Sequence, residues 1–180
     1  MRYTDWQATV PLDLTADPLW QRQDYRLALY AGDLGWDDVR RLGAVRATAD
    51  VAEQLGRALG SISANIAEGY SRASGSDRAR YYEYALGSAR ESRDWYHKGR
   101  HVLGAAAVRH RLKVLTSVVR LLTFAIPRER GTSLVTPRSK SACETAPEQW
   151  SPSAVSDPSP SQETRSQTRG SDRTRSRAPT

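Results

Sequence analysis

Cysteine is almost absent from the sequence, and so is any long apolar run. The one cysteine, Cys143, lies outside every apolar pattern and cannot form an internal disulfide, so we expect neither a disulfide framework nor a cysteine-based metal cluster. No stretch approaches the roughly eighteen apolar residues of a membrane span, and residues 1–15 lack the apolar core of a signal peptide. We therefore expect a cytoplasmic protein.

Recognisable catalytic and cofactor motifs are missing as well. The glycines form neither a phosphate-binding loop nor a dinucleotide-binding fingerprint. His97, His101 and His110 could in principle supply metal ligands, but lysines and arginines surround them and oppose a divalent cation. Cys143 has no histidine partner in sequence reach. We expect no catalytic residue, cofactor or metal site, and an enzyme is the least supported class.

The composition divides the chain near Pro127. Residues 127–180 hold seven of the nine prolines, are rich in Ser, Thr and Arg, and predict a disordered tail. The last part of this tail spaces its arginines as RNA-binding arms do, although solvated tails share that pattern. Residues 1–17 are expected to be an N-terminal extension. Residues 18–126 remain as one domain of ordinary size.

Apolar and small residues recur at steps of three and four in the second half of this domain, which predicts two helices. The third helix of the domain is expected from Asp77 to Leu103, and the fourth is expected to end at Pro127. The predicted seam of the third helix contains Tyr81, Ala85, Ser88, Ser92, Trp95, Gly99 and Val102. That of the fourth contains Val108, Leu112, Leu115, Val119, Leu122 and Ile126.

The first half of the domain predicts two further helices with less regular spacing. The first is expected to be short and to end near Gly32, and the second to extend back to Val39 with a possible bend at Gly43. Their apolar positions are Trp20, Leu27 and Tyr30 in the first, and Leu55, Leu59, Ile62 and Ile66 in the second. Because no alternating pattern predicts a strand and the connections are short, the expected fold class is all-α, an antiparallel up-down four-helix bundle.

The stretch SISANIAEGYSRAS, residues 61–74, places polar side chains where the second helix should end. Asn65 and Glu68 share one face, and Gly69 suits a left-handed residue that ends a helix. Ser74 and Asp77 form an S-x-x-D capping box for the next helix. We expect Glu68 to accept hydrogen bonds from N–H groups at the start of that helix, or to pair with Arg72 or Arg80. A lone carboxylate is not a reaction centre, so these residues predict a structural clasp.

The longer stretch SISANIAEGYSRASGSDRARYYEYALGSARES resembles the SIPANIAEG signature, followed by a Ser, an acid and ALGS, of a family encoded in intervening sequences of 23S rRNA genes. The resemblance is strongest over residues 55–92. It implies a four-helix bundle that assembles as a homopentamer and has a nucleic-acid-binding role without established chemistry. The sequence is more distantly similar to the accessory variability proteins that act with reverse transcriptases in diversity-generating retroelements.

Four positions depart from the family pattern. Ser63 stands where the family often has Pro, Asp77 where it has Glu, and Arg78 and Arg93 where apolar or acidic residues are usual. These departures bear on partner contacts rather than on the fold.

A basic segment, HKGRHVLGAAAVRHRLK, marks one end of the predicted bundle. Its cations are Lys98, Arg100, Arg109, Arg111 and Lys113. A dense positive patch attracts polyanions, and the net charge of +7 favours nucleic acid. The alternative is that these cations complement a helix dipole and are otherwise solvated.

We therefore predict a non-enzymatic, oligomeric protein that binds RNA or DNA through this surface, with RNA ahead of DNA. The alternative function is an adaptor that docks an acidic partner such as a reverse transcriptase.

Overall fold

The structure is a computed structural model that describes residues 1–131. These residues form seven α-helices and two short 3-10 turns, and no strand occurs among them. The prediction of an all-α fold is thus confirmed for this part of the chain. Most of the predicted tail, together with Cys143, lies outside the described residues.

Four long helices make up most of the molecule: α3 (Gln23–Gly43), α4 (Ala49–Tyr70), α5 (Gly75–Lys98) and α7 (Ala105–Glu129). The short elements are α1 (Tyr3–Gln7), α2 (Leu12–Thr15), the 3-10 turns Pro18–Gln21 and Arg46–Thr48, and α6 (Arg100–Leu103).

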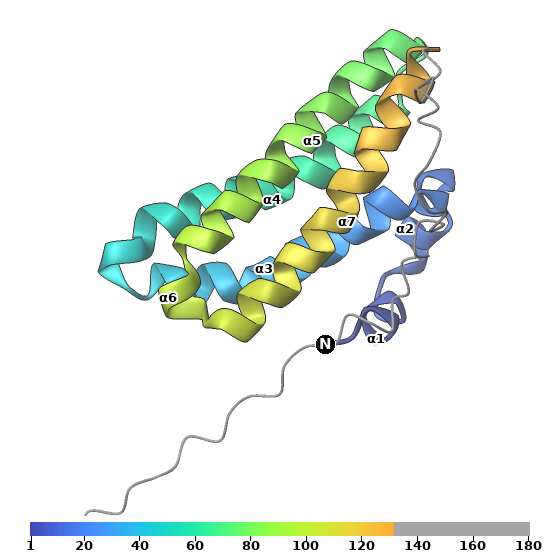
Figure 1. Cartoon of the computed structure of the whole chain (residues 1–180). Coiled ribbons are helices and arrows are strands. Elements are labelled where there is room, and N and C mark those ends of the chain that lie inside the picture. The colour runs from blue at the N-terminus through green and yellow to red at the C-terminus, as the bar shows by residue number, and fades with distance from the viewer. Residues whose placement is uncertain (132–180) are drawn as a thin grey trace, which may run out of the picture.

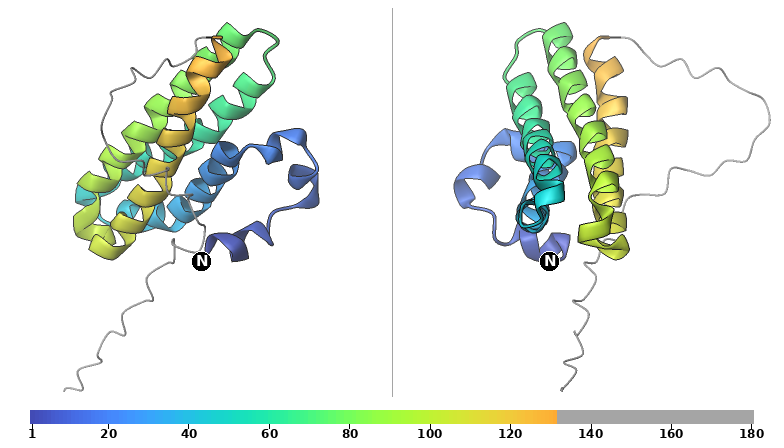
Figure 2. Two further views of the ribbon diagram at one scale, coloured as in Figure 1. Left: turned by 45° about the vertical axis from the view of Figure 1, so that its right-hand side comes forward. Right: turned by 90° about the vertical axis from the view of Figure 1, so that its left-hand side faces the viewer.

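The long helices pack side by side around one apolar core. Helix α3 contacts α4 and α7, and α5 contacts the same two helices. Figures 1 and 2 show the turn between α4 and α5 at one end of the molecule, together with the end of α7. The turn between α3 and α4 lies at the opposite end with α6 (Figure 1). Residues close in space at either end therefore come from distant parts of the sequence.

The buried face of α4 follows the apolar spacing of its sequence. Leu55, Leu59, Ile62 and Ile66 are all buried, as the steps of three and four require for one face of a helix. Burial of such a stripe, at about 25 cal/mol per Å² of apolar surface, is the main force that holds a helix of this kind in place.

The buried face of α5 is wider than the predicted seam and is displaced from it. Its buried residues are Ala79, Tyr82, Ala85, Ala89, Ser92 and Tyr96. Ala85 and Ser92 belong to the predicted seam, whereas Tyr81, Ser88 and Trp95 are only half-buried. The seam therefore marks one edge of the buried face, where the Ser88 hydroxyl donates to the Ser61 Oγ of α4 at 3.0 Å.

Several predicted helix boundaries are wrong. The third helix of the domain, expected to run to Leu103, ends at Lys98, and Gly99 separates it from the short helix α6; the second begins at Ala49 and does not reach back to Val39. The first long helix does not end near Gly32: it runs to Gly43 and includes Val39, because Ala31, Leu34 and Leu42 continue its buried face. A helical glycine costs only about 1 kcal/mol relative to alanine, which this packing outweighs. Pro127 does not end the last helix either. It lies inside α7, which continues to Glu129, because the loss of the one N–H donor of a proline does not by itself end a helix.

The N-terminal extension packs against α3. Tyr3 and Trp6 of α1 are buried, and their rings contact that of Tyr30 at centroid distances of 5.3 and 5.2 Å. The Trp6 indole N–H donates to Asp33 Oδ2 at 2.5 Å, and the Tyr30 hydroxyl donates to the Met1 carbonyl at 2.7 Å. Aromatic packing with satisfied polar tips therefore ties the start of the chain to α3.

Candidate nucleic-acid interface

Arg111, one of the five predicted surface cations, is buried. Its side chain is enclosed between α7 and α3, and the residue is only 8% exposed. Its Nε donates to Asp38 Oδ2 at 2.8 Å, and Asp38 is itself 2% exposed. Arg111 stands three residues after buried Val108 and four before buried Leu115, on the apolar face of the helix. The assignment of Arg111 to a nucleic-acid surface is therefore wrong.

Asp38 and Arg111 belong to a buried polar cluster that joins three helices. The Tyr96 hydroxyl of α5 donates to Asp38 Oδ2 at 3.1 Å, and an Arg111 guanidinium nitrogen lies 2.8 Å from His110 Nδ1. Burial, reinforced by the negative charge of Asp38, holds the pKa of the Tyr96 hydroxyl well above its usual value. The opposite charges of Asp38 and Arg111 satisfy each other, so this cluster has a structural role.

Lys98 and Arg100 are exposed but engaged locally. The Lys98 ammonium lies 2.6 Å from Asp94 Oδ2 and 4.0 Å from the centre of the Trp95 ring. Arg100 donates to the His97 carbonyl at 2.8 Å, where α5 has just ended. Both contacts agree with cations that complement the C-terminal end of a helix.

Helix α7 carries four exposed cations that form no such contacts. Arg109, Lys113, Arg120 and Arg128 are all exposed. None of the four has a hydrogen bond or ion pair with another residue of the described range 1–131. The only acidic residue of α7, Glu129, is taken up by Arg78 of α5 at 2.6 Å. We call these four residues the α7 cationic face.

The helical repeat places this face on one side of the molecule. At about 100° per residue, Arg109, Lys113 and Arg120 fall within an arc of about 40°, and Arg128 widens it to about 100°. From Arg109 to Arg128 the face extends about 28 Å along the helix, at about 1.5 Å per residue. Arg109 and Lys113 lie towards the N-terminal end of α7, where positive charge gains nothing from the helix dipole.

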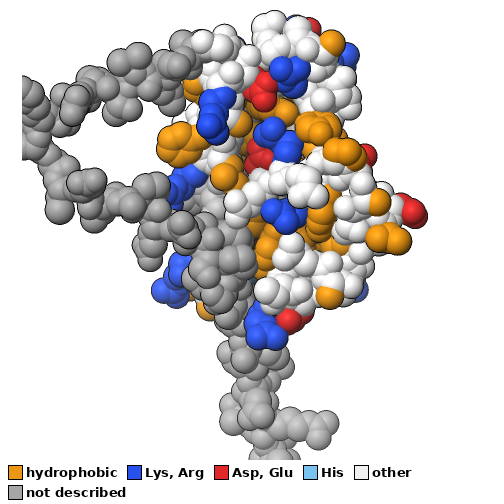
Figure 3. All heavy atoms as spheres, turned by 90° about the vertical axis from the view of Figure 1, so that its right-hand side faces the viewer, with side chains coloured by type: hydrophobic (Ala, Val, Ile, Leu, Met, Phe, Trp, Pro, Cys, Tyr) orange, Lys and Arg blue, Asp and Glu red, His pale blue; other side chains and the backbone are white. Residues whose placement is uncertain are grey.

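Figure 3 shows one side of the molecule, on which Lys and Arg side chains lie among apolar ones and acidic groups are fewer.

Arg120 and Arg128 were not singled out in the sequence. Lys113 is four residues after Arg109, and Arg120 is seven residues after Lys113. This helical spacing would have placed Arg120 on the same side of the helix as Arg109 and Lys113. The buried stripe had already fixed which side of the helix is exposed.

The predicted clasp is present, with contacts that differ in detail. Ser74 is the N-cap of α5, because its hydroxyl accepts the Asp77 N–H at 3.1 Å. The Asp77 carboxylate accepts the Ser74 hydroxyl at 2.7 Å. Asn65 donates to the carbonyl and to the hydroxyl of Ser61, at 2.8 and 2.9 Å, and Ser61 links in turn to Ser88 of α5.

Glu68 follows one of its predicted alternatives, the pair with Arg72, whereas Gly69 acts differently from the prediction. Glu68 pairs with Arg72, which also donates to the Tyr81 hydroxyl at 2.8 Å, but the Glu68 side chain is 50% exposed. It is therefore a surface residue rather than a buried acceptor. Gly69 is not a left-handed terminal residue, since α4 continues to Tyr70. A Cβ at Gly69 would lie 2.7 Å from the Tyr82 ring, so glycine is needed for the close approach of α5.

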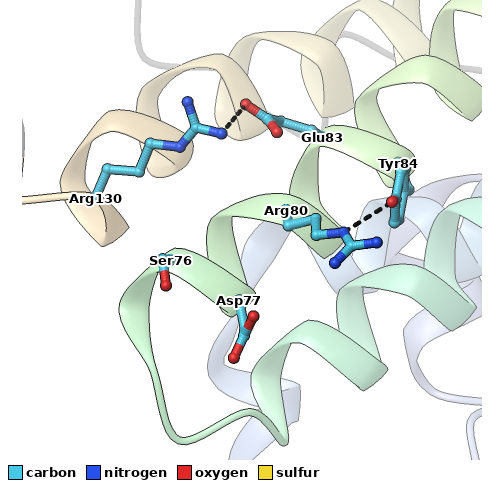
Figure 4. A pocket seen from close by; sticks show the side chains of 6 residues that line it. All are labelled: Ser76, Asp77, Arg80, Glu83, Tyr84 and Arg130. Atoms are coloured by element: carbon cyan, nitrogen blue, oxygen red, sulfur yellow. Dashed lines mark hydrogen bonds and ion pairs between the residues drawn. The ribbon is translucent and has the colours of Figure 1, made fainter.

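A shallow hollow of about 800 Å³ lies at the start of α5 (Figure 4). Its lining residues are Ser76, Asp77, Arg80, Glu83, Tyr84 and Arg130. Arg130 pairs with Glu83 at 2.7 Å, and Arg80 donates to the Tyr84 hydroxyl at 2.9 Å. Its two cations and two carboxylates balance in charge, and each has a hydrogen-bond or ion-pair partner, so this hollow gives no argument for a charged ligand.

Residues 1–131 contain no group of three or more His, Cys, Asp or Glu side chains that could hold a metal ion. No helix in the same range is long and apolar enough to cross a membrane.

The fold and surface of residues 1–131 define a class, a small all-helical domain with an unpaired cationic face on the last long helix of that range. Within this class, the model of the 23S rRNA-intervening sequence protein family matches residues 45–122, which confirms the resemblance to that family. The matched range runs from the turn before α4 to the last third of α7 and includes the clasp, the buried Arg111 and three of the four cations of the α7 cationic face. Neither a curated protein nor a solved structure matches the chain.

Proposed function

We propose that this protein is a non-enzymatic, antiparallel up-down four-helix bundle that binds RNA or DNA through the α7 cationic face. One observation carries the proposal: four exposed cations share one side of a rigid helix and have no acidic partner among residues 1–131. The description of the matching family, 23S rRNA-intervening sequence protein, refers to a ribosomal RNA. RNA is therefore proposed ahead of DNA.

Phosphate contacts supply the free energy of such binding. Each cation that neutralises a phosphate releases condensed counterions, which lowers log K by about 0.7 to 0.9 per unit of log salt. Four contacts would give a slope of roughly 3 to 4 per protomer. Such contacts position the nucleic acid without reading its bases, so RNA and DNA of different sequence would bind with similar affinity.

Self-association is part of the proposal. Several large apolar side chains remain exposed among residues 1–131, with Trp36 at 72% the most exposed aromatic of that range and Tyr84 at 47%. Exposed apolar groups of this size are often covered by a partner, and a second copy of the chain would cover them while bringing several cationic faces together. The number of subunits, five, rests on the family resemblance alone. Sedimentation at micromolar concentration should show a closed oligomer, and a monomer at that concentration would contradict this part.

A charge reversal in the full-length chain tests the proposed interface. The triple variant R109E/K113E/R120E should weaken the binding of a short RNA and of a DNA of the same sequence by at least tenfold each at low salt, because three phosphate contacts become repulsions. The matched control, R40E/R46E/R57E, makes the same change of net charge at three exposed arginines outside the α7 cationic face.

Equal losses in the two triple variants would mean that net charge, not the α7 cationic face, determines binding. A variant that lacks residues 132–180 measures the share of the tail. If the parent binds no nucleic acid at low salt, an adaptor that docks an acidic protein, such as a reverse transcriptase, becomes the better account of the cationic face.

A further inference from the structure

One apolar residue lies between two cations of the α7 cationic face and cannot itself contact a phosphate. Phe124 is the only phenylalanine of the chain and is 60% exposed. It does not belong to the apolar core. The residues of this part of α7 that pack in the core are Leu122 and Ile126. Its position lies between those of Arg120 and Arg128, four residues from each.

The spacing places the ring between two guanidinium groups on one side of the helix. Residues four apart are neighbours on a helix surface, and Arg120 and Arg128 are separated by about 12 Å along the axis. Neither arginine has a partner among the described residues, so both can contact phosphates on either side of the ring. A phenyl ring that is mostly exposed lacks much of the apolar packing by which an aromatic side chain usually stabilises a protein.

Proteins that hold single-stranded nucleic acid combine these two elements. Cations follow the backbone, and an aromatic side chain between them stacks on an unpaired base, which needs no particular sequence because every base has a flat face. A fully paired duplex offers no free base face, since its bases are stacked on one another. The ring therefore distinguishes unpaired from paired nucleic acid, whereas the cations alone do not.

We propose that Phe124 stacks on an unpaired base of the bound nucleic acid while Arg120 and Arg128 contact the flanking phosphates. The ligand class is thus a single strand, or an RNA loop or bulge with an extruded base. This inference rests on the proposed nucleic-acid binding and adds to it a preference between two forms of the same polymer.

The test compares one oligonucleotide in two forms, single-stranded RNA and the duplex made from it, with the full-length protein. Phe124→Ala should weaken single-strand binding on the order of tenfold and change duplex binding by less than twofold. Phe124→Trp should retain or increase single-strand affinity, because a larger ring also stacks. Tyr70→Ala is the matched control, since Tyr70 is an exposed aromatic of α4 outside the α7 cationic face.

A fluorescent base analogue placed in the single strand gives a second readout. Its emission should be quenched on binding to the parent and to Phe124→Trp, and less so on binding to Phe124→Ala at saturating protein. Sedimentation of Phe124→Ala should match that of the parent. A changed oligomeric state would instead make Phe124 a contact between subunits and would overturn the inference.

The outcomes separate this inference from the proposed function. If Phe124→Ala weakens single-strand and duplex binding equally, or neither, while R109E/K113E/R120E weakens both, the stacking role is wrong and the phosphate interface stands. If R109E/K113E/R120E binds both forms as the parent does, the interface itself is wrong and the stacking role falls with it.

Discussion

Arg109 and Arg111 are two residues apart on α7 and lie in opposite environments. Arg111 is buried against the Asp38 carboxylate, within a cluster that joins α3, α5 and α7. Arg109 is exposed and has no acidic partner among residues 1–131. The comparison shows that the density of cations in a sequence does not define a binding surface. The side of the helix and the presence of a carboxylate partner decide which arginine holds the fold and which is available to a ligand.

The largest effect on stability is expected from removal of the buried arginine. Arg111→Ala would leave the Asp38 charge buried without its arginine, and we expect the free energy of unfolding to fall by about 3 to 5 kcal/mol. Arg109→Ala should change it by less than about 0.5 kcal/mol, as is usual for exposed positions. Chemical denaturation of both variants measures the difference. Equal stabilities would contradict the division between a structural and an exposed arginine.

A glycine substitution in α4 tests how closely α4 and α5 pack. Gly69→Ala places a Cβ 2.7 Å from the Tyr82 ring and 2.9 Å from Tyr81 Cβ, and should destabilise the protein by about 1 to 3 kcal/mol. Gly60→Ala, on the same helix, meets no atom within 4 Å and should stabilise by up to about 1 kcal/mol. Thermal melts of the two variants should move in opposite directions. A shift in the same direction would argue against close packing at Gly69.

The buried cluster also predicts a dependence on pH. The Tyr96 pKa is raised in the folded protein, so the unfolded chain loses this proton first as the pH rises. The stabilising effect is therefore complete below the ordinary pKa of about 10 and is lost above it, at up to about 1.4 kcal/mol per pH unit. Tyr96→Phe should reduce the fall in stability between pH 9 and 11. An unchanged pH profile would mean that Tyr96 ionises equally in both states.

The smallest effect is expected at the clasp. Glu68 and Arg72 form an exposed ion pair, and such pairs contribute little to stability because solvent and salt screen them. Glu68→Ala should therefore melt within error of the parent in physiological salt. A large loss of stability would favour the other predicted role of Glu68, an acceptor for N–H groups at the start of α5. A loss of nucleic-acid binding without a loss of stability would give Glu68 a functional role.

The sequence predicted the features that depend on local pattern. The apolar spacing of Leu55, Leu59, Ile62 and Ile66 and the Ser74–Asp77 cap both hold in the structure, because each is decided within one helix or one turn. The extent of α3 past Gly32 was not predicted, since packing between helices outweighs the weak preference of a glycine.

The environment of Arg111 was missed for a related reason. Its partner, Asp38, is 73 residues away in the sequence, and no local pattern connects the two. The exposed set of Arg109, Lys113 and Arg120 could have been recognised once Val108, Leu115 and Leu122 fixed the buried side of the helix. The role of Phe124 needed its exposed fraction as well as its spacing.

The central claim, that the α7 cationic face holds phosphates, is tested most directly by the salt dependence of binding. For the full-length parent and for R109E/K113E/R120E, the equilibrium constant for one single-stranded RNA would be measured over a range of salt concentrations. The account predicts a plot of log K against log salt that is flatter in the variant by about 2 units per protomer, since three contacts of about 0.7 each are lost. Parallel plots for the two proteins would contradict it.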